Sequence, residues 1–189
     1  RGWWPVLPQR AARGARPVYD PFRKSLTSRQ RFEIAVGAIL TQNTAWTNVE
    51  KAMVELHKNN ALSLARIKHL PRRRLARFIR SSGYFNQKSI KLKSLVDFLL
   101  VYGRDERAME KLRQGSVPKI RTALLGINGV GPETADSILL YALEKPLFVV
   151  DAYTRRIFSR HGFIRGDEPY DEIRMVFEKN LPRSVKLWN

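Results

Sequence analysis

Apolar residues recur at intervals of three and four along most of the chain, which is the period of an amphipathic helix. The first face with this spacing consists of Phe32, Ala35, Val36, Ile39 and Leu40. A second face consists of Trp46, Val49, Met53 and Leu56. Because Thr47 and Glu50 stand three residues apart, they are the expected capping box of this second helix.

Two further helices are expected between residues 71 and 100. Pro71 suits the first turn of a helix, and Gly83 suits the position just past its end. The apolar face of that helix consists of Leu75, Phe78 and Ile79. The next helix follows Asn86, and its apolar face consists of Ile90, Leu95, Phe98 and Leu99.

The rest of the chain adds shorter segments. Short helices are expected at 109–112 and 119–125, and longer ones at 152–161 and 170–180. Strand-like sequence is confined to "PLFVV" at 146–150, and the first thirty residues, rich in Pro, Gly and Arg, predict an irregular arm. The pattern therefore predicts an all-α protein.

The charge of the chain points to an anionic partner. Lys and Arg number 35 against 17 Asp and Glu, which gives a formal net charge of +18. Such an excess informs about partners rather than about fold. We favour nucleic acid over an anionic membrane, because the chain has no lone basic amphipathic helix and no lipidation motif.

Several kinds of site are excluded by composition. The 189 residues contain no cysteine, so they hold no disulfide or thiolate metal site. His57, His69 and His161 lack metal-ligand spacing, and no metal site is expected. No apolar run approaches the ~20 residues that span a bilayer, and no secretory signal is visible. We therefore expect an intracellular protein, cytoplasmic and nucleoid-associated in a bacterium or archaeon.

A glycine-rich turn precedes the helix that starts at Pro132. Gly126 is expected to form a left-handed helix cap, and Gly129 and Gly131 a tight turn. Such a turn exposes backbone N–H groups at a helix N-terminus, where they can bind phosphate without reading sequence. The DNA-phosphate contacts predicted here are Gly126, Gly129, Val130, Gly131, Glu133 and Thr134. An ordinary helix–turn–helix corner is the alternative.

These residues also carry a family resemblance. "LLGINGVGPETADSILLYAL" followed by "VVDAYTRRIFSRHG" resembles the helix-hairpin-helix and catalytic-aspartate signature of the endonuclease III superfamily of DNA glycosylases. "GAILTQNTAWTNVEKAM" and "GYFNQKSIKLKSL" are similar to other landmarks of that family, in the same order, so the likeness covers about residues 32 to 189.

The resemblance implies a fold and a partner. It implies two helical lobes, with double-stranded DNA that contains a damaged base bound in the cleft between them by a monomer. One lobe would be a six-helix domain of residues 30–135 that ends in the hairpin. The other would combine residues 1–29 with 136–189. Many relatives bind an iron–sulfur cluster through four cysteines after the last helix. Here a [4Fe-4S] cluster would require cysteines beyond Asn189.

Asp151 is the expected catalytic carboxylate, since it matches the catalytic aspartate of the family. Breaking an N-glycosidic bond builds positive charge on the sugar, which a fixed carboxylate stabilises while it orients water. The alternative role is a helix N-cap, and both roles are compatible.

Glu133 occupies the position at which strand-cutting family members carry a lysine that forms a Schiff base. Because a carboxylate cannot form an imine, the resemblance implies a monofunctional glycosylase that leaves an abasic site. Two alternatives stay open. One is a bifunctional glycosylase and lyase acting on oxidised or mismatched pyrimidines through another lysine, and the other is a non-catalytic hairpin module that binds DNA.

The family likeness also suggests how the base is extruded and held. Gln42 and Tyr84 would fill the space left in the duplex. Trp3, Trp4, Pro5 and Trp46 would form the base pocket, similar to that of the 3-methyladenine glycosylase branch. Aromatic faces suit cationic alkylated purines, which are the favoured substrates.

Basic residues outside the hairpin are further candidates for phosphate contacts. The residues predicted to contact DNA phosphates are Lys88, Lys91, Lys93, Arg155 and Arg156, whereas the run 72–74 is interpreted as a solvated face.

Overall fold

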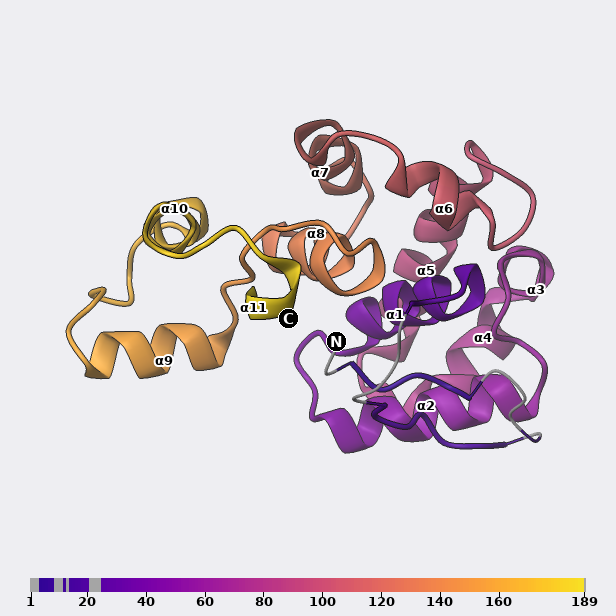
Figure 1. Ribbon diagram of the computed structural model, residues 1–189. Coiled ribbons are helices and arrows are strands. Elements are labelled where there is room, and N and C mark those ends of the chain that lie inside the picture. Colours follow the sequence, from indigo (N-terminus) through magenta and orange to yellow (C-terminus); the bar gives the residue numbers. More distant parts are fainter. Residues whose placement is uncertain (1–3, 9–11, 13, 21–24, 189) are drawn as a thin grey trace.

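The computed structural model describes residues 4–8, 12, 14–20 and 25–188 (Figure 1). Within these residues the chain is helical, and the only β feature is an isolated antiparallel bridge between Val6 and Val18. The larger helices are α1 (Ser28–Leu40), α2 (Trp46–Lys58), α5 (Phe85–Leu100), α7 (Val117–Leu125), α9 (Ala152–Arg160) and α10 (Tyr170–Asn180). The shorter elements are α3 (Leu64–His69), α4 (Arg72–Phe78), η1 (Arg80–Ser82), α6 (Ala108–Arg113), α8 (Pro132–Ser137), η2 (Ile138–Ala142) and α11 (Val185–Trp188).

Helix α1 is the centre of the larger lobe. All of its residues from Gln30 to Leu40 are buried, and it packs against α2, α5, α6, α8 and η2. Its start is fixed by a capping box in which the Thr27 hydroxyl accepts from Gln30 N at 3.2 Å and the Gln30 side chain accepts from Thr27 N at 3.0 Å. The N-terminus of this buried helix is thus satisfied before it enters the core.

The start of α2 differs from the prediction. The helix begins at Trp46, with Ala45 at the N-cap and no side-chain cap, so Thr47 lies inside the helix and the predicted capping box with Glu50 is wrong. The apolar face is as predicted, since Val49, Met53 and Leu56 are buried.

Between α2 and α5 the chain forms one helix more than expected. Helix α3, six residues long, was not predicted. Pro71 is the N-cap of α4 rather than a residue of its first turn, and α4 ends at Phe78. Gly83 (φ 66°) instead ends the separate turn η1. On α5, Leu95 and Leu99 are buried, but Ile90 is exposed and does not belong to the core face.

The N-terminal arm packs on the larger lobe. Trp4, Val6 and Leu7 are buried in the same apolar cluster as α1 and α2, and Leu7 N donates to the Glu33 carboxylate at 2.8 Å. The Trp4 ring also packs on Tyr141 of η2, with centroids 5.3 Å apart, so the arm contacts both predicted groups of residues. The predicted division into residues 30–135 and residues 1–29 plus 136–189 stays a prediction.

The smaller lobe is built by α9 and α10, which stand apart from the main body in Figure 1, whereas α11 lies near α8 and packs its Trp188 with Leu140 and Val149. Its apolar cluster is small and consists of Val150, Ile164, Ile173 and Phe177. No residue of α9 is buried, although the Phe158 ring packs edge-on against Phe177 with centroids 4.5 Å apart. None of the helices in the described part of the chain is both long enough and apolar enough to cross a membrane.

Candidate active site

A cavity of about 740 Å³ lies where the two lobes meet. Its lining comes from the loop after α1, the hairpin and the start of α9, together with one residue each of α5 and α10. The residues of the lining that carry chemistry are Gln42, Lys91, Glu133, Thr134, Asp151, Tyr153 and Tyr170. The structure thus brings the hairpin, Gln42 and Asp151 together around one cavity.

Asp151 caps α9 and borders this cavity. Its Oδ1 accepts from Thr154 N at 2.7 Å and from the Thr154 hydroxyl at 2.8 Å. The other carboxylate oxygen forms no hydrogen bond with the residues that the structure describes. A cap fixes the orientation of the side chain. One oxygen therefore holds the carboxylate in place, and the second is available at the cavity.

The extended segment 146–150 delivers Asp151 to the cavity and is held by side chains of α10. Phe148 N donates to Glu178 Oε1 at 3.0 Å, and Val150 N donates to the Tyr170 hydroxyl at 3.2 Å. Alternate N–H groups of an extended chain point the same way, as they would toward a neighbouring strand. Residues 170, 174 and 178 are four apart and share one face of the helix. We call Tyr170, Arg174 and Glu178 the α10 stripe. Tyr170 and Glu178 accept the hydrogen bonds that a neighbouring strand would accept from the extended segment.

A buried ionic network joins the α10 stripe to the hairpin helix. Asp136 of α8 is 0% exposed and accepts from Arg121 of α7 at 2.7 and 3.2 Å. Arg174 reaches Glu178 at 2.7 Å, and its Nε lies 3.9 Å from Asp136. Asp136 also bonds to Tyr170, whose pKa is raised by burial and by the charge of Asp136. Tyr170 therefore stays protonated, donates to Asp136 and accepts from Val150.

The sharp turn of the hairpin is made at Gly129. Its φ is +82°, and a Cβ there would stand 2.5 Å from carbons of the Lys91 side chain, so glycine is required both by conformation and by space. Gly126, in contrast, has a right-handed conformation (φ −73°), and the predicted left-handed cap at this residue is wrong. The positive φ falls three residues later because Gly126 still belongs to the last turn of α7.

The hairpin N–H groups divide into free and occupied ones. Val130 N donates to Ile127 O at 3.0 Å and is therefore used inside the turn, where it cannot serve as the predicted phosphate contact. Gly129 N and Gly131 N form no hydrogen bond with other described residues. Pro132 opens α8 as predicted, and it has no N–H to contribute.

Gln42 is fully engaged with the hairpin. Its Nε2 donates to Gly129 O at 3.0 Å and to the Thr134 hydroxyl at 2.9 Å, while its Oε1 accepts from Lys91 Nζ at 2.6 Å. Thr134, predicted to contact phosphate, is buried beneath this amide. For Gln42 to enter a duplex, as predicted, these three bonds would have to break.

Lys88 lies in a different place from the one predicted. Its side chain is 2% exposed, and Nζ donates to Leu40 O at 2.8 Å and to Ser82 O at 2.6 Å. Burial, aided by the charge of Lys91, lowers the pKa of Lys88 to about 8. A buried ammonium with two backbone acceptors is not available to a DNA phosphate. It instead joins the backbone just before Gln42 to the backbone just before Tyr84.

Tyr84 is placed as a protruding residue. It precedes α5 in the left-handed conformation (φ 43°), and its side chain is 65% exposed. Such a conformation is uncommon for an aromatic residue. Lys88 binds Ser82 O near Tyr84 and Leu40 O near Gln42. The backbones next to the two residues predicted to fill the duplex are therefore held by one side chain.

Glu133 shares the cavity with Asp151. Its carboxyl is in the first turn of α8, and its pKa is raised, first by desolvation and then by the negative charge of Asp151, against the opposing effect of Arg155. Among the described residues that line the cavity, the one lysine is Lys91, whose ammonium is bound to Gln42.

Arg155 is turned toward the loop after α9. Its Nη1 donates to Gly166 O at 3.1 Å and to Glu168 O at 2.9 Å. These bonds brace the loop against α9, so Nη1 is not available for the phosphate contact predicted for this residue.

The tryptophans lie beside the cavity rather than in its lining. Trp4 is buried over Gly37 and packs edge-on against Trp46, with ring centroids 5.7 Å apart. Pro5 is half-buried, and Trp3 falls outside the described residues. The base pocket built from these residues stays a prediction.

Two aromatic side chains that the sequence did not single out do line the cavity, Tyr153 and Tyr170. Tyr153 is 63% exposed, and the guanidinium of Arg156 lies 4.8 Å from its ring centroid. Its position two residues after Asp151 was the available signal. Tyr170 is nineteen residues further along the chain than Asp151, and only the packing of α10 brings it to the site.

Comparison with known proteins decides the family. A sequence model of the HhH-GPD superfamily of base excision DNA repair proteins matches residues 36–183. The chain belongs to this superfamily. A protein of Methanocaldococcus jannaschii described as a DNA repair glycosylase is 46% identical over 159 residues, which are 84% of this chain and 71% of the relative.

Solved structures agree with this assignment. The 3-methyladenine DNA glycosylase of H. pylori bound to 1,N6-ethenoadenine is 32% identical, with a TM-score of 0.68 over 82% of this chain and 74% of that one. A trapped covalent intermediate of endonuclease III with DNA is 25% identical, with a TM-score of 0.68 over 84% and 68%. The predicted all-α helix-hairpin-helix fold is therefore confirmed. This HhH-GPD protein is a DNA N-glycosylase of base excision repair, and DNA is its partner.

Proposed function

We propose that the protein hydrolyses the N-glycosidic bond of a damaged base in double-stranded DNA and leaves an abasic site. The observation that carries this proposal is the state of Asp151, which has one oxygen fixed by Thr154 and the other free at the cavity. As the C1′–N bond breaks, its electron pair leaves with the base and positive charge grows on the sugar. A fixed carboxylate stabilises that charge, and it accepts a proton from the water that bonds to C1′.

The residue types around the cavity support hydrolysis without strand cleavage. Glu133 stands where an imine-forming lysine would be needed, and a carboxylate supplies no amine. Its raised pKa favours the protonated form more than is usual for a glutamate, which reduces repulsion with Asp151. The favoured mechanism is therefore monofunctional, with a single chain acting on a single lesion.

Alkylated purines are the substrates we favour. A cationic purine such as 3-methyladenine is already a good leaving group, so one carboxylate suffices. Support comes from the likeness to the H. pylori 3-methyladenine glycosylase and from the aromatic pair Trp4 and Trp46 beside the cavity.

The test is a panel of duplexes that carry one lesion each, scored for released base and for strand breaks before and after alkali. We expect base release from alkylated purines, with breaks only after alkali. Activity on an oxidised pyrimidine such as thymine glycol, with none on alkylated purines, would contradict the substrate proposal.

A second candidate, a glycosylase with lyase activity, is favoured by one observation. Lys91 lines the same cavity as Asp151 and could supply an amine. Borohydride would then trap the protein on lesion DNA, and Lys91→Gln would abolish trapping. The monofunctional proposal predicts no trapped product with either protein.

A further inference from the structure

Positive charge is concentrated in one acid-free part of the chain. Residues 56–96 contain eleven of the 35 lysines and arginines and none of the 17 acidic residues. This segment covers α3, α4, η1 and most of α5. Two of its cations, Lys88 and Lys91, belong to the site already described. The arginines of α4 and η1 do not, and we call them the α4 arginine face: Arg72, Arg73, Arg74, Arg77 and Arg80.

All five side chains of the α4 arginine face are exposed, while Leu75, Ala76, Phe78 and Ile79 on the opposite side of α4 are buried. None of the five forms an ion pair with a described residue. Arg74 rests over the Phe78 ring at 5.7 Å, and Lys68 of this segment forms an exposed ion pair with Asp97, just beyond it.

Unpaired like charges on one helix face carry a cost. Arginines three and four residues apart repel one another by a few tenths of a kcal/mol for each pair. A surface that serves solubility alone intersperses both signs, as the rest of this protein does. A single-sign face with no counterion among the residues that the structure describes indicates a polyanionic partner, in contrast with the interpretation of 72–74 as merely solvated.

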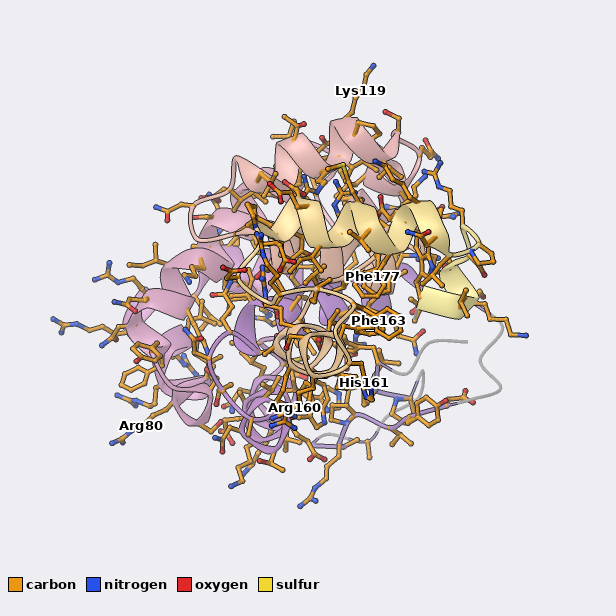
Figure 2. The ribbon with its side chains drawn as sticks, turned by 90° about the vertical axis from the view of Figure 1, so that its left-hand side faces the viewer. Arg80, Lys119, Arg160, His161, Phe163 and Phe177 are labelled. Carbon is orange, nitrogen blue, oxygen red and sulfur yellow. The ribbon has the colours of Figure 1, made fainter. Side chains whose placement is uncertain are left out.

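The α4 arginine face continues into the rim of the active site. The Ser81 hydroxyl donates to Asn48 O at 2.9 Å, which places η1 beside the start of α2. Ser82 O and Leu40 O share the Lys88 ammonium, so η1 is also fixed to the loop that carries Gln42. In Figure 2, Arg80 projects from the edge of the molecule in the same view that has α9 in front.

We propose that the α4 arginine face binds phosphates of duplex DNA that flanks the lesion, beyond the hairpin contacts. Arg73, Arg77 and Arg80 are spaced four and three apart, so they extend over about 10 Å at ~1.5 Å per residue. Phosphates of one strand follow at ~3.4 Å along the duplex axis, so about three such intervals, which join four phosphates, match this length. The proposal rests on the proposed function only in taking the lesion as the centre of the bound DNA.

The experiment removes three of these charges in the variant Arg73→Gln/Arg77→Gln/Arg80→Gln. Affinity for an undamaged duplex of about 30 base pairs is measured against salt concentration and compared with a duplex of about 10 base pairs. For the long duplex we expect at least a tenfold loss of affinity at low salt and a fall of roughly 2 to 3 in the slope of log K against log salt. The short duplex should lose much less.

A matched control removes the same charge elsewhere, in Arg104→Gln/Lys111→Gln/Lys119→Gln. These residues are exposed and outside the ion pairs of the described residues, and Lys119 projects from the top of the molecule in Figure 2, whereas Arg80 projects at the lower left. The control should keep most of the parental slope. Equal losses in the two variants would show an effect of net charge alone and would overturn the proposal. Parental affinity in the α4 variant, or equal loss on both duplexes, would overturn it too.

This test is separate from that of the proposed function. Binding to undamaged DNA needs no excision, so the salt slope tests the face even if no lesion is released. Conversely, base release from the short lesion duplex at saturating enzyme should be unchanged in the α4 variant, and far-UV circular dichroism verifies its fold.

Discussion

Arginines are used in opposite ways in two regions of this protein. On α7 and α10, Arg121 and Arg174 are mostly buried and each reaches more than one carboxylate, with Asp136 completely enclosed between them. On α4 the arginines are exposed and unpaired within the described chain. The first region holds its own backbone in place, whereas the second is left free for a partner.

The difference separates the region that fixes the position of the active-site backbone from the region that can attract DNA. The α10 stripe fixes the backbone N–H groups just before Asp151 and links them to the hairpin helix. A misplaced catalytic group loses rate steeply, so this rigidity would serve the chemistry proposed for Asp151. Phosphate binding needs charge but no such precision, which the α4 arginine face can supply from flexible side chains.

The largest effect is expected where the ionic network is broken. Asp136→Ala leaves Arg121 without its buried partner, and the free energy of unfolding should fall by about 3 to 5 kcal/mol in urea denaturation. Asp97→Ala, which breaks only the exposed pair with Lys68, should cost at most about 1 kcal/mol. Similar losses in both variants would contradict the contrast between the two regions.

Lys88 gives a measurable pH dependence for the contact that links the two residues predicted to fill the duplex, Gln42 and Tyr84. Its pKa in the folded protein is about 8, below the ordinary value of 10.5, so between these pH values the unfolded chain binds more protons. Stability contributed by this group should therefore rise with pH across that window, by about 3 kcal/mol in total.

Chemical denaturation of the parent and of Lys88→Met at pH 8 and pH 10.5 measures this effect. The difference between the two proteins isolates Lys88 from other titrating groups. A difference that is constant across the window would show that Lys88 is not buried as described.

Tyr170→Phe tests the α10 stripe at its contact with Val150, in the extended segment that leads to Asp151. The ring is kept, but Val150 N and Asp136 lose the hydroxyl between them, at a cost of ~1 kcal/mol. We expect single-turnover base release to slow about tenfold, with unchanged affinity for lesion DNA. Tyr102→Phe, at a half-buried tyrosine packed on Phe98 in the other lobe, is the control and should keep the parental rate. Reduced DNA affinity in Tyr170→Phe would contradict a positioning role.

The smallest effect is expected on the α4 arginine face itself. Arg77→Gln removes repulsion with its neighbours three and four residues away, so stability should stay the same or rise by a few tenths of a kcal/mol. Thermal unfolding measures the change. A clear loss of stability would mean that Arg77 has a structural partner.

Periodicity predicted most of the helices, because their apolar faces are long enough to show a period. Helix α3 was missed because six residues with two buried positions, Leu64 and Ile67, give no clear repeat. The capping box was assigned to Thr47 rather than to Thr27, since both have an acceptor three residues on and only the start of the helix distinguishes them.

Site residues could be predicted where a short stretch of sequence contains them, and could not be predicted where the packing of distant segments brings them to the site. Spacing and family likeness singled out Asp151 and the hairpin, which line one cavity, whereas their roles stay predictions. Lys88 was assigned to the surface because a lysine is rarely buried without partners, and its two carbonyl acceptors come from segments far apart in sequence. Tyr170 and Glu178 reach the catalytic segment only through the packing of α10, which no local pattern reveals.

The most direct test of the account is base release by Asp151→Asn. An asparagine keeps the oxygen that accepts from Thr154 and thus the helix cap, but it removes the negative charge beside the sugar. Under single-turnover conditions on duplex DNA with one alkylated purine, we expect release to slow by at least about 100-fold while DNA affinity stays parental. Release at the parental rate would contradict the central claim that this carboxylate stabilises the sugar as the base departs.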